Sequence, residues 1–278
     1  MITAKTDVYC IFGNPVRHSL SPLIHNSAFE ELGINAVYVA FEPDSIEQGV
    51  RSMRELGIKG ASITIPFKVD VIPFLDSIDP LAERIGSVNT LLNLDGKIIG
   101  YNTDGLGATL ALKNNHIEIE NQTYLVIGNG GSARAIAFTL LQNNAKIVIA
   151  GRNQQRIANL KNDLAKHGTV DHILLDELEE NYMENVDVII NTTPVGMHPE
   201  AEKSPIKNSL IVEKHAVFDI VYSPDITILL KTANEKGCII VRGFEMLLYQ
   251  GVKQFEIWTG KEAPVQTMYN VLDKAINK

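Results

Sequence analysis

The fold is decided by Tyr124-Leu125-Val126-Ile127-Gly128-Asn129-Gly130-Gly131-Ser132-Ala133-Arg134. Residues 124–127 predict a short buried strand, and residues 135–141 predict the helix that follows the turn. The turn matches the G-x-G-x-x-A pattern of a dinucleotide site. Gly128 permits the tight turn, Gly130 lets the backbone approach a pyrophosphate, and Ala133 lets helix and strand pack closely. The helix N-terminus attracts the phosphate charge. A plain glycine turn between a strand and a helix has a similar sequence, so the neighbouring residues must decide.

Composition describes a globular protein long enough for two domains. The chain has 278 residues, of which 45% are hydrophobic and 21% charged, and its formal net charge is −8. This charge argues against a general nucleic-acid binder, which needs clustered Lys and Arg. No apolar run has the length of a membrane span, and the first residues lack the pattern of a secretion leader. We therefore expect a cytoplasmic protein without a membrane or nucleic-acid partner.

The two cysteines, Cys10 and Cys238, stand in apolar runs typical of strands. We expect two reduced thiols in the core, because no Cys/His spacing indicates a metal site.

Strands and helices alternate along the whole chain, which predicts an α/β protein with mostly parallel sheets. Asp95-Gly96 lies between two strand-like runs and predicts a hairpin. A helix is expected from Asp104 to about Asn115, in a position to link two domains. The other elements expected before the glycine loop are strands at 8–13, 36–41, 61–65, 87–94 and 97–101 and helices at 22–32 and 45–56.

The second part of the chain repeats the strand–helix rhythm. Its expected strands are 124–127, 146–150, 186–191, 216–220 and 238–241, and its expected helices are 154–166 and 226–236. Two late helices, 243–258 and 265–276, have no strand between them. Because the parallel sheet is complete by Val241, we expect these helices to pack back on the first domain.

The residues after the second strand indicate which dinucleotide binds. An NAD site usually carries Asp or Glu about 20 residues after the glycine loop, to hold the ribose 2′-hydroxyl. No acidic residue occurs from Gln142 to Asn162, whereas Arg152 and Arg156 stand four residues apart. A guanidinium can pair with the 2′-phosphate of NADP. The alternative is that both arginines are merely solvated on an exposed helix, but the missing acid favours NADP.

Three polar clusters precede the glycine loop. In the first, Ser21 followed by Pro22 is typical of a helix N-cap, and Ser19 beside it offers a second hydroxyl for a carboxylate. The second ends in Lys68, just beyond a strand that carries Ser62 and Thr64 on one face. Lys68 on its own is equally typical of a solvated surface residue.

The third cluster contains Asn89, Asn102 and Asp104. Asn102 and Asp104 are also typical of turn and helix-cap positions, so a structural role is open for both.

Taken together, these clusters resemble the shikimate dehydrogenase family, and the similarity covers nearly the whole chain. The motifs that carry it are His18-Ser19-Leu20-Ser21-Pro22, Thr64-Ile65-Pro66-Phe67-Lys68, Ser87-Val88-Asn89-Thr90, Asn102-Thr103-Asp104-Gly105, Asn191-Thr192-Thr193-Pro194-Val195-Gly196-Met197, Asp219-Ile220-Val221-Tyr222-Ser223-Pro224 and Glu245-Met246-Leu247-Leu248-Tyr249-Gln250-Gly251. The resemblance implies a substrate domain of residues 1–103 plus 243–278 and a Rossmann-type NADP domain of residues 104–242, with the site in the cleft between them.

The resemblance also implies residue roles. Lys68 and Asp104 form the catalytic pair, and Ser19 and Ser21 hold the substrate carboxylate with Tyr222 nearby. The implied substrate-binding residues are Ser19, Ser21, Thr64, Lys68, Asn89, Asp104, Tyr222 and Gln250. The implied cofactor-binding residues are Gly128, Asn129, Gly130, Gly131, Ser132, Ala133, Gly151, Arg152, Asn153, Arg156, Met197, Val221 and Gly243.

The chain departs from the family pattern at several positions. Ser62 stands where an Asn is usual, and a hydroxyl forms fewer hydrogen bonds than a carboxamide. We therefore expect weaker recognition of one ring hydroxyl, which leaves the substrate preference open. Asn129 and Ser132 replace small alanines in the glycine loop, and Gly151 and Asn153 replace the usual Asn and Thr, while Arg152 is kept.

The implied reaction is the reversible NADPH-dependent reduction of 3-dehydroshikimate to shikimate, on the route to chorismate and the aromatic amino acids. One alternative is a quinate/shikimate dehydrogenase of broad specificity, which Ser62 keeps open. Another is a non-catalytic dinucleotide-sensing protein, although such a protein would not need Lys68 and Asp104 together. The expected partner is a small-molecule substrate, and the expected oligomeric state is a monomer or a homodimer.

Overall fold

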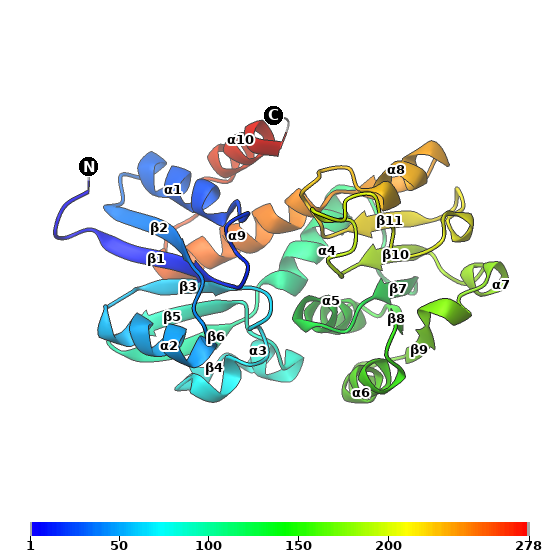
Figure 1. Cartoon of the computed structure of the whole chain (residues 1–278), viewed down its shortest axis with the longest axis horizontal. Coiled ribbons are helices and arrows are strands. Elements are labelled where there is room, and N and C mark those ends of the chain that lie inside the picture. The colour runs from blue at the N-terminus through cyan, green and yellow to red at the C-terminus, as the bar shows by residue number, and fades with distance from the viewer. Residues whose placement is uncertain (1, 277–278) are drawn as a thin grey trace. The chain divides into compact units, whose positions relative to one another are not determined.

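The computed structural model describes residues 2–276, and Met1, Asn277 and Lys278 lie outside the described residues. The chain folds into two compact units, whose elements are labelled in Figure 1. Unit 1 consists of Met1–Asp104 and Leu247–Lys278, and unit 2 consists of Gly105–Met246. Helix α4 (Asp104–Asn114) leads from unit 1 into unit 2, and helix α9 (Gly243–Thr259) leads back.

Unit 1 is built on a six-stranded mixed sheet with the order β2-β1-β3-β5-β6-β4. Its strands are β1 (Asp7–Phe12), β2 (Ala36–Phe41), β3 (Gly60–Ile63), β4 (Ser77–Ile78), β5 (Thr90–Leu94) and β6 (Lys97–Tyr101). Strands β1, β2 and β3 are parallel, and β5 is antiparallel to β3 and β6. The β5–β6 hairpin turns at Asp95 and Gly96, whose φ angles of 52° and 89° fit the turn that Asp-Gly predicts.

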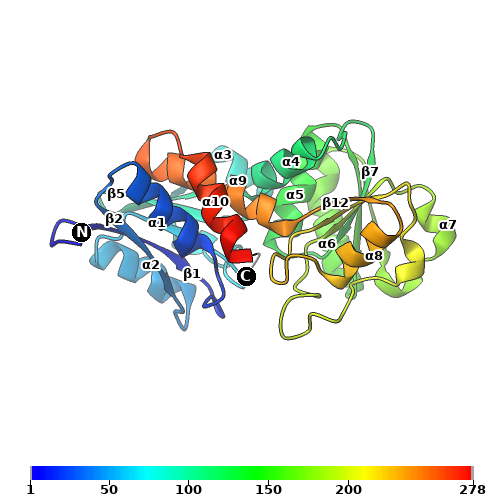
Figure 2. The same ribbon diagram turned by 90° about the horizontal axis from the view of Figure 1, so that it is seen from above.

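Helices cover both faces of this sheet. They are α1 (Ser21–Glu31), α2 (Ile46–Glu55), α3 (Pro80–Ile85), the second part of α9, and α10 (Val265–Ile276). On the face of α2 and α3, Cys10 and Phe12 of β1 join a core with Val50, Met53 and Ala82. On the other face, the ring of Tyr9 lies 5.1 Å from that of Phe29 and 5.4 Å from that of Trp258. Helices α1 and α10 lie side by side (Figure 2).

The two late helices return to unit 1, which confirms the prediction. Trp258 near the end of α9 covers Gly60 of β3, where a Cβ atom would lie 2.5 Å from the indole. The indole Nε1 donates a hydrogen bond to the Leu91 carbonyl of β5 at 2.9 Å. A side chain at Gly60 would therefore push α9 away from the sheet.

Unit 2 is built on a six-stranded sheet in which all strands are parallel, with the order β12-β11-β10-β7-β8-β9. Its strands are β7 (Thr123–Ile127), β8 (Lys146–Gly151), β9 (Val170–Leu174), β10 (Val188–Asn191), β11 (Ala216–Asp219) and β12 (Ile239–Val241). This is the Rossmann order, and the direction of winding reverses between β7 and β10. Ligands of such sheets bind at the carboxyl ends of the strands at this switch point.

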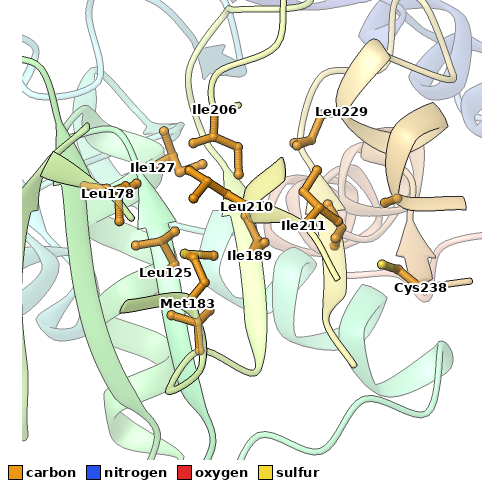
Figure 3. Close-up of a cluster of buried hydrophobic side chains, with 14 of the residues drawn as sticks. Leu125, Ile127, Leu178, Met183, Ile189, Ile206, Leu210, Ile211, Leu229 and Cys238 are labelled. Atoms are coloured by element: carbon orange, nitrogen blue, oxygen red, sulfur yellow. The ribbon is translucent and has the colours of Figure 1, made fainter. Parts of the chain in front are cut away.

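The helices of unit 2 connect the strands and pack on the sheet. Besides α4 they are α5 (Gly131–Gln142), α6 (Gln154–Leu164), α7 (Glu180–Met183) and α8 (Ile228–Glu235). Figure 3 shows part of the core, in which Leu125, Ile127 and Ile189 of the sheet lie among Leu210 and Leu229. Every hydrophobic residue of β7, β10 and β11 is buried, as expected for central strands with helices on both faces.

Several sequence predictions were wrong in detail. Helix α1 begins at Ser21, so Ser21 is not its N-cap; the cap residue is Leu20, which makes no side-chain cap bond. The chain enters α1 through a turn, and the Ser19 hydroxyl oxygen accepts the Ser21 N–H at 3.2 Å. Helix α5 begins at Gly131, four residues before the predicted start at Ala135, because the glycine-rich turn is completed by Gly130.

Other elements were missed or misplaced. Strand β3 runs from Gly60 to Ile63, whereas the prediction was 61–65, so Thr64 lies beyond the strand that it was predicted to share with Ser62. Edge strand β9 was missed, because Asp171 and His172 interrupt its apolar residues. The short elements β4, α3 and α7 were also missed, since they offer too few residues for a periodic pattern.

Candidate active site

Lys68 and Asp104 form an ion pair within unit 1. The Lys68 Nζ donates to Asp104 Oδ2 at 2.5 Å, and the two side chains are 14% and 4% exposed. The Lys68 carbonyl accepts the Val88 N–H at 2.8 Å, which fixes the turn after β3 against the segment before β5. Asp104 is the first residue of α4, where the helix dipole favours a carboxylate. A mostly buried ammonium, which can donate a proton, therefore lies beside a buried carboxylate that orients it.

Asn89 holds the second oxygen of the Asp104 carboxylate. Its Nδ2 donates to Asp104 Oδ1 at 2.7 Å and to Thr103 Oγ1 at 3.0 Å, and its Oδ1 accepts the Thr103 N–H at 2.9 Å. The Asn89 Nδ2 also lies 3.4 Å from Oε1 of Gln250 on α9, which accepts from it. The structure therefore brings together four predicted site residues from four separate segments of the sequence.

The remaining predicted substrate residues of unit 1 lie near the start of α1 and the end of β3. Ser21 is buried, and its hydroxyl is hydrogen-bonded to the Tyr38 phenol, which lowers the pKa of that phenol against the larger rise caused by burial. Thr64 packs its methyl against Gly13, where a Cβ atom would lie 2.3 Å from Thr64 Cγ2. Gly13 thus allows the half-buried Thr64 to reach its position beside β1.

In unit 2, the turn after β7 has the geometry that a phosphate needs. Gly128 has a φ of +120°, and a Cβ atom there would lie 2.4 Å from Thr192 Oγ1. Gly130 is the N-cap of α5, which has no side-chain cap bond, and a Cβ atom at Gly130 would meet nothing within 4 Å. Open space in front of the first turn of a long helix suits a pyrophosphate. The glycine loop thus fits the dinucleotide that its sequence predicts.

The arginines after β8 lie at the start of α6. Gly151 ends β8, and a Cβ atom there would lie 2.6 Å from Ile157 Cγ2 on α6. Asn153 caps α6, because its Oδ1 accepts the Arg156 N–H at 3.0 Å. Arg152 and Arg156 are exposed, and neither forms an ion pair with another of residues 2–276. Within residues 2–276, no carboxylate pairs with either guanidinium group, so both are available to pair with a phosphate.

The loops after β10 and β11 are fastened by Asn191 and Asp219, to which sequence reasoning gave no role. Asn191 Nδ2 donates to Asp219 Oδ1 at 3.0 Å and to the Val195 carbonyl at 3.1 Å. Asp219 also accepts the Val221 N–H and the Thr227 hydroxyl. Burial raises the pKa of the Asp219 carboxyl to about 7, although these three donors oppose the rise.

The predicted residues Met197, Val221 and Tyr222 lie on these loops. Val221 lies against Gly243, where a Cβ atom would approach the Val221 carbonyl to 2.4 Å. The Met197 N–H donates to the Pro194 carbonyl at 3.0 Å, and Tyr222 is half-buried in unit 2. The glycine at 243 is therefore required by close packing on the loop after β11.

Comparison with known proteins agrees with this geometry. Residues 11–91 match the family model "Shikimate dehydrogenase substrate binding domain", residues 109–240 match "Shikimate / quinate 5-dehydrogenase", and residues 243–272 match "Shikimate 5'-dehydrogenase C-terminal domain". The chain belongs to the shikimate dehydrogenase family.

Individual members of the family are similar over their whole length. Shikimate dehydrogenase (NADP(+)) from Methanocaldococcus jannaschii is 40% identical over 286 residues, which cover 100% of both chains. The enzyme of the same name from Pyrococcus furiosus is 42% identical and covers 98% of this chain and 97% of its own.

Solved structures show the same fold. A shikimate dehydrogenase in complex with NADP+ superposes with a TM-score of 0.92 at 39% identity, covering 100% of this chain and 98% of its own. Shikimate 5-dehydrogenase from Thermus thermophilus in complex with NADP(H) and shikimate has a TM-score of 0.87 at 32% identity, with 97% and 100% covered. The predicted fold class, a substrate domain joined to a Rossmann-type domain, is therefore confirmed.

Among residues 2–276, no group of three or more His, Cys, Asp or Glu side chains could hold a metal ion. No helix in the same range has the length and apolar character to cross a bilayer. Cys10 and Cys238 are both free and buried, as predicted.

Sequence reasoning missed a group of buried polar residues in unit 1. Neither Tyr38 nor Gln254 is singled out by the sequence, which gives Thr90 no role within its motif and marks Ser62 only as a strand residue and as a departure from the family pattern. All four residues are buried. All four are hydrogen-bonded to one another or to Asn89. The one available signal was Gln254, which follows Gln250 by one helical turn and therefore lies on the same face of α9.

Proposed function

We propose that this chain catalyses the reversible NADPH-dependent reduction of 3-dehydroshikimate to shikimate, a reaction on the route to chorismate and the aromatic amino acids. The observation that carries the proposal is the buried Lys68–Asp104 ion pair held by Asn89, in a chain whose relatives are named shikimate dehydrogenase (NADP(+)). A protein that only sensed a dinucleotide would have no use for this pair.

The substrate is held by unit 1. Ser19 and Ser21 hydrogen-bond the carboxylate, with Tyr222 of unit 2 as a further donor. Thr64, Asn89 and Gln250 hydrogen-bond the ring oxygens. Hydroxyl and carboxamide groups suit this substrate, because its hydroxyls both donate and accept and its carboxylate only accepts.

Lys68 and Asp104 carry out the proton transfer. When NADPH is bound it supplies the hydride to the ketone carbon. The Lys68 ammonium lies against the ketone oxygen, stabilises the negative charge that develops there, and delivers the proton that completes the hydroxyl. In the reverse direction the neutral amine accepts that proton. Asp104 orients Lys68 and accepts a hydrogen bond from a neighbouring substrate hydroxyl.

NADP is held by unit 2. The pyrophosphate lies on the glycine loop, and the 2′-phosphate pairs with Arg152 and Arg156. Met197, Val221 and Gly243 lie beside the nicotinamide. The full set of cofactor-binding residues is Gly128, Asn129, Gly130, Gly131, Ser132, Ala133, Gly151, Arg152, Asn153, Arg156, Met197, Val221 and Gly243.

The domain assignment follows from these roles, with a substrate domain of residues 1–103 plus 243–278 and an NADP domain of residues 104–242. The division into Met1–Asp104 with Leu247–Lys278 and Gly105–Met246 supports it. The cytoplasmic location and the monomeric or homodimeric state stay predictions.

The test is an assay of purified protein that follows NADPH absorbance with shikimate or quinate and with NADP+ or NAD+. We expect turnover with shikimate and NADP+ to exceed that of every other pair. General acid help is worth roughly 10²–10⁴-fold, so Lys68→Ala should lower kcat by that order. Lys113→Ala, which removes the same charge from an exposed position on α4, is the control and should match the wild type.

Three outcomes would count against parts of the proposal. Turnover with quinate and NAD+ above that with shikimate and NADP+ would favour the broad-specificity enzyme. No turnover with any pair would favour the sensor. Near-normal kcat in Lys68→Ala would remove this lysine from the chemistry.

A further inference from the structure

A continuous line of buried polar side chains runs through unit 1 from β2 to the Lys68–Asp104 pair. Its members come from four elements and are each at most 5% exposed: Tyr38 on β2, Ser62 on β3, Thr90 on β5, Gln254 on α9, and Asn89 just before β5. Ser62 and Thr90 stand directly opposite each other in the antiparallel pairing of β3 and β5. Gln254 reaches both of them from the helix above, and its hydrogen bond to Ser62 joins residues 192 positions apart.

The direction of each hydrogen bond in this line is fixed by its neighbours. Gln254 Nε2 lies 3.1 Å from the Asn89 carbonyl oxygen, which can only accept. The amino group of the carboxamide must therefore face Asn89, so Oε1 faces Ser62. The Ser62 hydroxyl donates to that oxygen at 2.8 Å and accepts from the Tyr38 hydroxyl at 2.6 Å.

Tyr38 is suited to begin the line. Burial raises the pKa of its phenol well above the ordinary value of 10.0, so the hydroxyl keeps its proton. The Tyr38 ring is also stacked on the buried ring of His25, with a centroid distance of 4.5 Å. The phenol thus enters the line as a fixed donor.

The line of hydrogen bonds continues from Gln254 toward Asp104. Gln254 Nε2 also donates to Thr90 Oγ1 at 3.0 Å, which leaves the Thr90 proton to donate to Asn89 Oδ1 at 2.7 Å. The Thr103 N–H, which can only donate, points at the same Asn89 oxygen. These two donors hold Asn89 Oδ1 on the side of Thr90 and the Thr103 N–H, so Nδ2 must face the Asp104 carboxylate. If the carboxamide were reversed, its oxygen would lie against a carboxylate oxygen and repel it.

We propose that Thr90 and Gln254 are positioning residues of this enzyme, which fix the Asn89 carboxamide so that it holds Asp104 toward Lys68. The inference rests on the catalytic role proposed for Lys68 and Asp104. The hydrogen bonds also give Ser62 a structural role that the sequence analysis did not predict. The Ser62 proton is committed to Gln254, so Ser62 serves this line of side chains and does not donate to a substrate hydroxyl.

The test compares a variant that keeps the shape of Thr90 without its hydroxyl and a variant that keeps the hydroxyl. Thr90→Val removes the hydroxyl between Gln254 and Asn89, whereas Thr90→Ser keeps it. A hydrogen bond contributes a net factor of roughly 3–10, so we expect kcat for shikimate with NADP+ to fall by about 10-fold in Thr90→Val. The KM for shikimate should change by less than about 2-fold, because positioning acts on the transition state. Thr90→Ser should retain most of the wild-type kcat.

A second variant and the melting temperatures separate positioning from folding. Thr90→Val leaves the Gln254 amino group without one acceptor and costs stability. Gln254→Met removes the amino group that holds the Thr90 oxygen, and it also leaves the Ser62 hydroxyl and the Asn89 carbonyl without Gln254. Both variants are therefore assayed well below their melting temperatures, where the fall in kcat should remain in each. Gln254→Met carries the test if Thr90→Val gives no folded protein.

The outcomes that overturn the inference are distinct from those that overturn the proposed function. Wild-type kcat in Thr90→Val or in Gln254→Met would overturn the positioning role. So would an equal loss in Thr90→Val and Thr90→Ser, or a loss confined to KM. Wild-type protein and Lys68→Ala are assayed in the same series. An inactive wild type would overturn both proposals, whereas an active wild type with an impaired Lys68→Ala leaves the proposed function standing whatever Thr90 does.

Discussion

The candidate site in unit 1 and the candidate site in unit 2 are built by opposite means. In unit 1, buried side chains from segments far apart in the sequence bond to one another, as Lys68, Asn89 and Asp104 do. In unit 2, short runs of consecutive residues form the site. The turn at Gly130 exposes backbone N–H groups at the start of α5, and exposed arginines flank Asn153 at the start of α6. A proton must be delivered to one oxygen atom, so the first site needs fixed side chains. A pyrophosphate accepts any N–H that reaches it, so the second site needs a loop of the right shape.

The comparison predicts that the two sites fail in different ways, and its most severe test is Asp104→Asn. This change removes the charge that orients Lys68 while keeping the size of the side chain. We expect kcat to fall by about 10²–10³-fold. The dissociation constant for NADP+, measured by quenching of protein fluorescence, should stay within about 2-fold of the wild type.

The control for this experiment is Asp70→Asn, which makes the same change at an exposed position in unit 1. Weakened NADP+ binding in Asp104→Asn would show that the two sites are not separate in function.

The opposite failure is expected in Arg152→Ala. Hydrogen bonds between charged groups contribute about 1.5–3 kcal/mol, so the KM for NADP+ should rise by roughly 10–100-fold. The KM for NAD+, which lacks the 2′-phosphate, should stay nearly constant, and kcat at saturating NADP+ should change little. Steady-state assays with each cofactor measure all three quantities.

Arg51→Ala removes an exposed arginine from unit 1 and serves as the control. Equal increases in KM for NADP+ and NAD+ would reject the assignment of Arg152 to the 2′-phosphate.

The smallest effect concerns stability in unit 2. The pKa of Asp219 is raised by burial to about 7 from an ordinary value of 3.8, so the folded state binds this proton more tightly than the unfolded chain. Stability from this group is therefore present at the acid end and is lost as the pH rises from 3.8 through about 7. Asp219→Asn keeps a neutral group at every pH. Its melting temperature relative to wild type should rise by a few degrees between about pH 5 and about pH 8.

Asp176→Asn, at an exposed position in unit 2, should show no such trend. A difference between Asp219→Asn and wild type that is independent of pH would contradict the shift in the Asp219 pKa.

The two units also differ in how far the sequence predicts them. The turn at Gly128 and the exposed arginine at 152 are local features, and the structure has both at the predicted positions. The prediction of Ser21 as the N-cap of the first helix was wrong. The hydroxyl oxygen that accepts a backbone N–H at this helix start belongs to Ser19, two positions earlier. Edge strand β9 was missed because polar residues break its pattern, and an edge strand needs less apolar surface than a central one.

Sequence alone determined the longer strands and helices, the glycine loop and the preference for NADP, because periodicity, turn residues and charge spacing act over a few neighbouring positions. It also supplied Lys68 and Asp104 through a family resemblance. Only the tertiary structure decided which way the Asn89 carboxamide faces. That orientation depends on the register that places Ser62 opposite Thr90 and on the gap at Gly60 that lets α9 carry Gln254 to both. Such contacts join residues far apart in the chain, and they exist only once sheet and helix have packed.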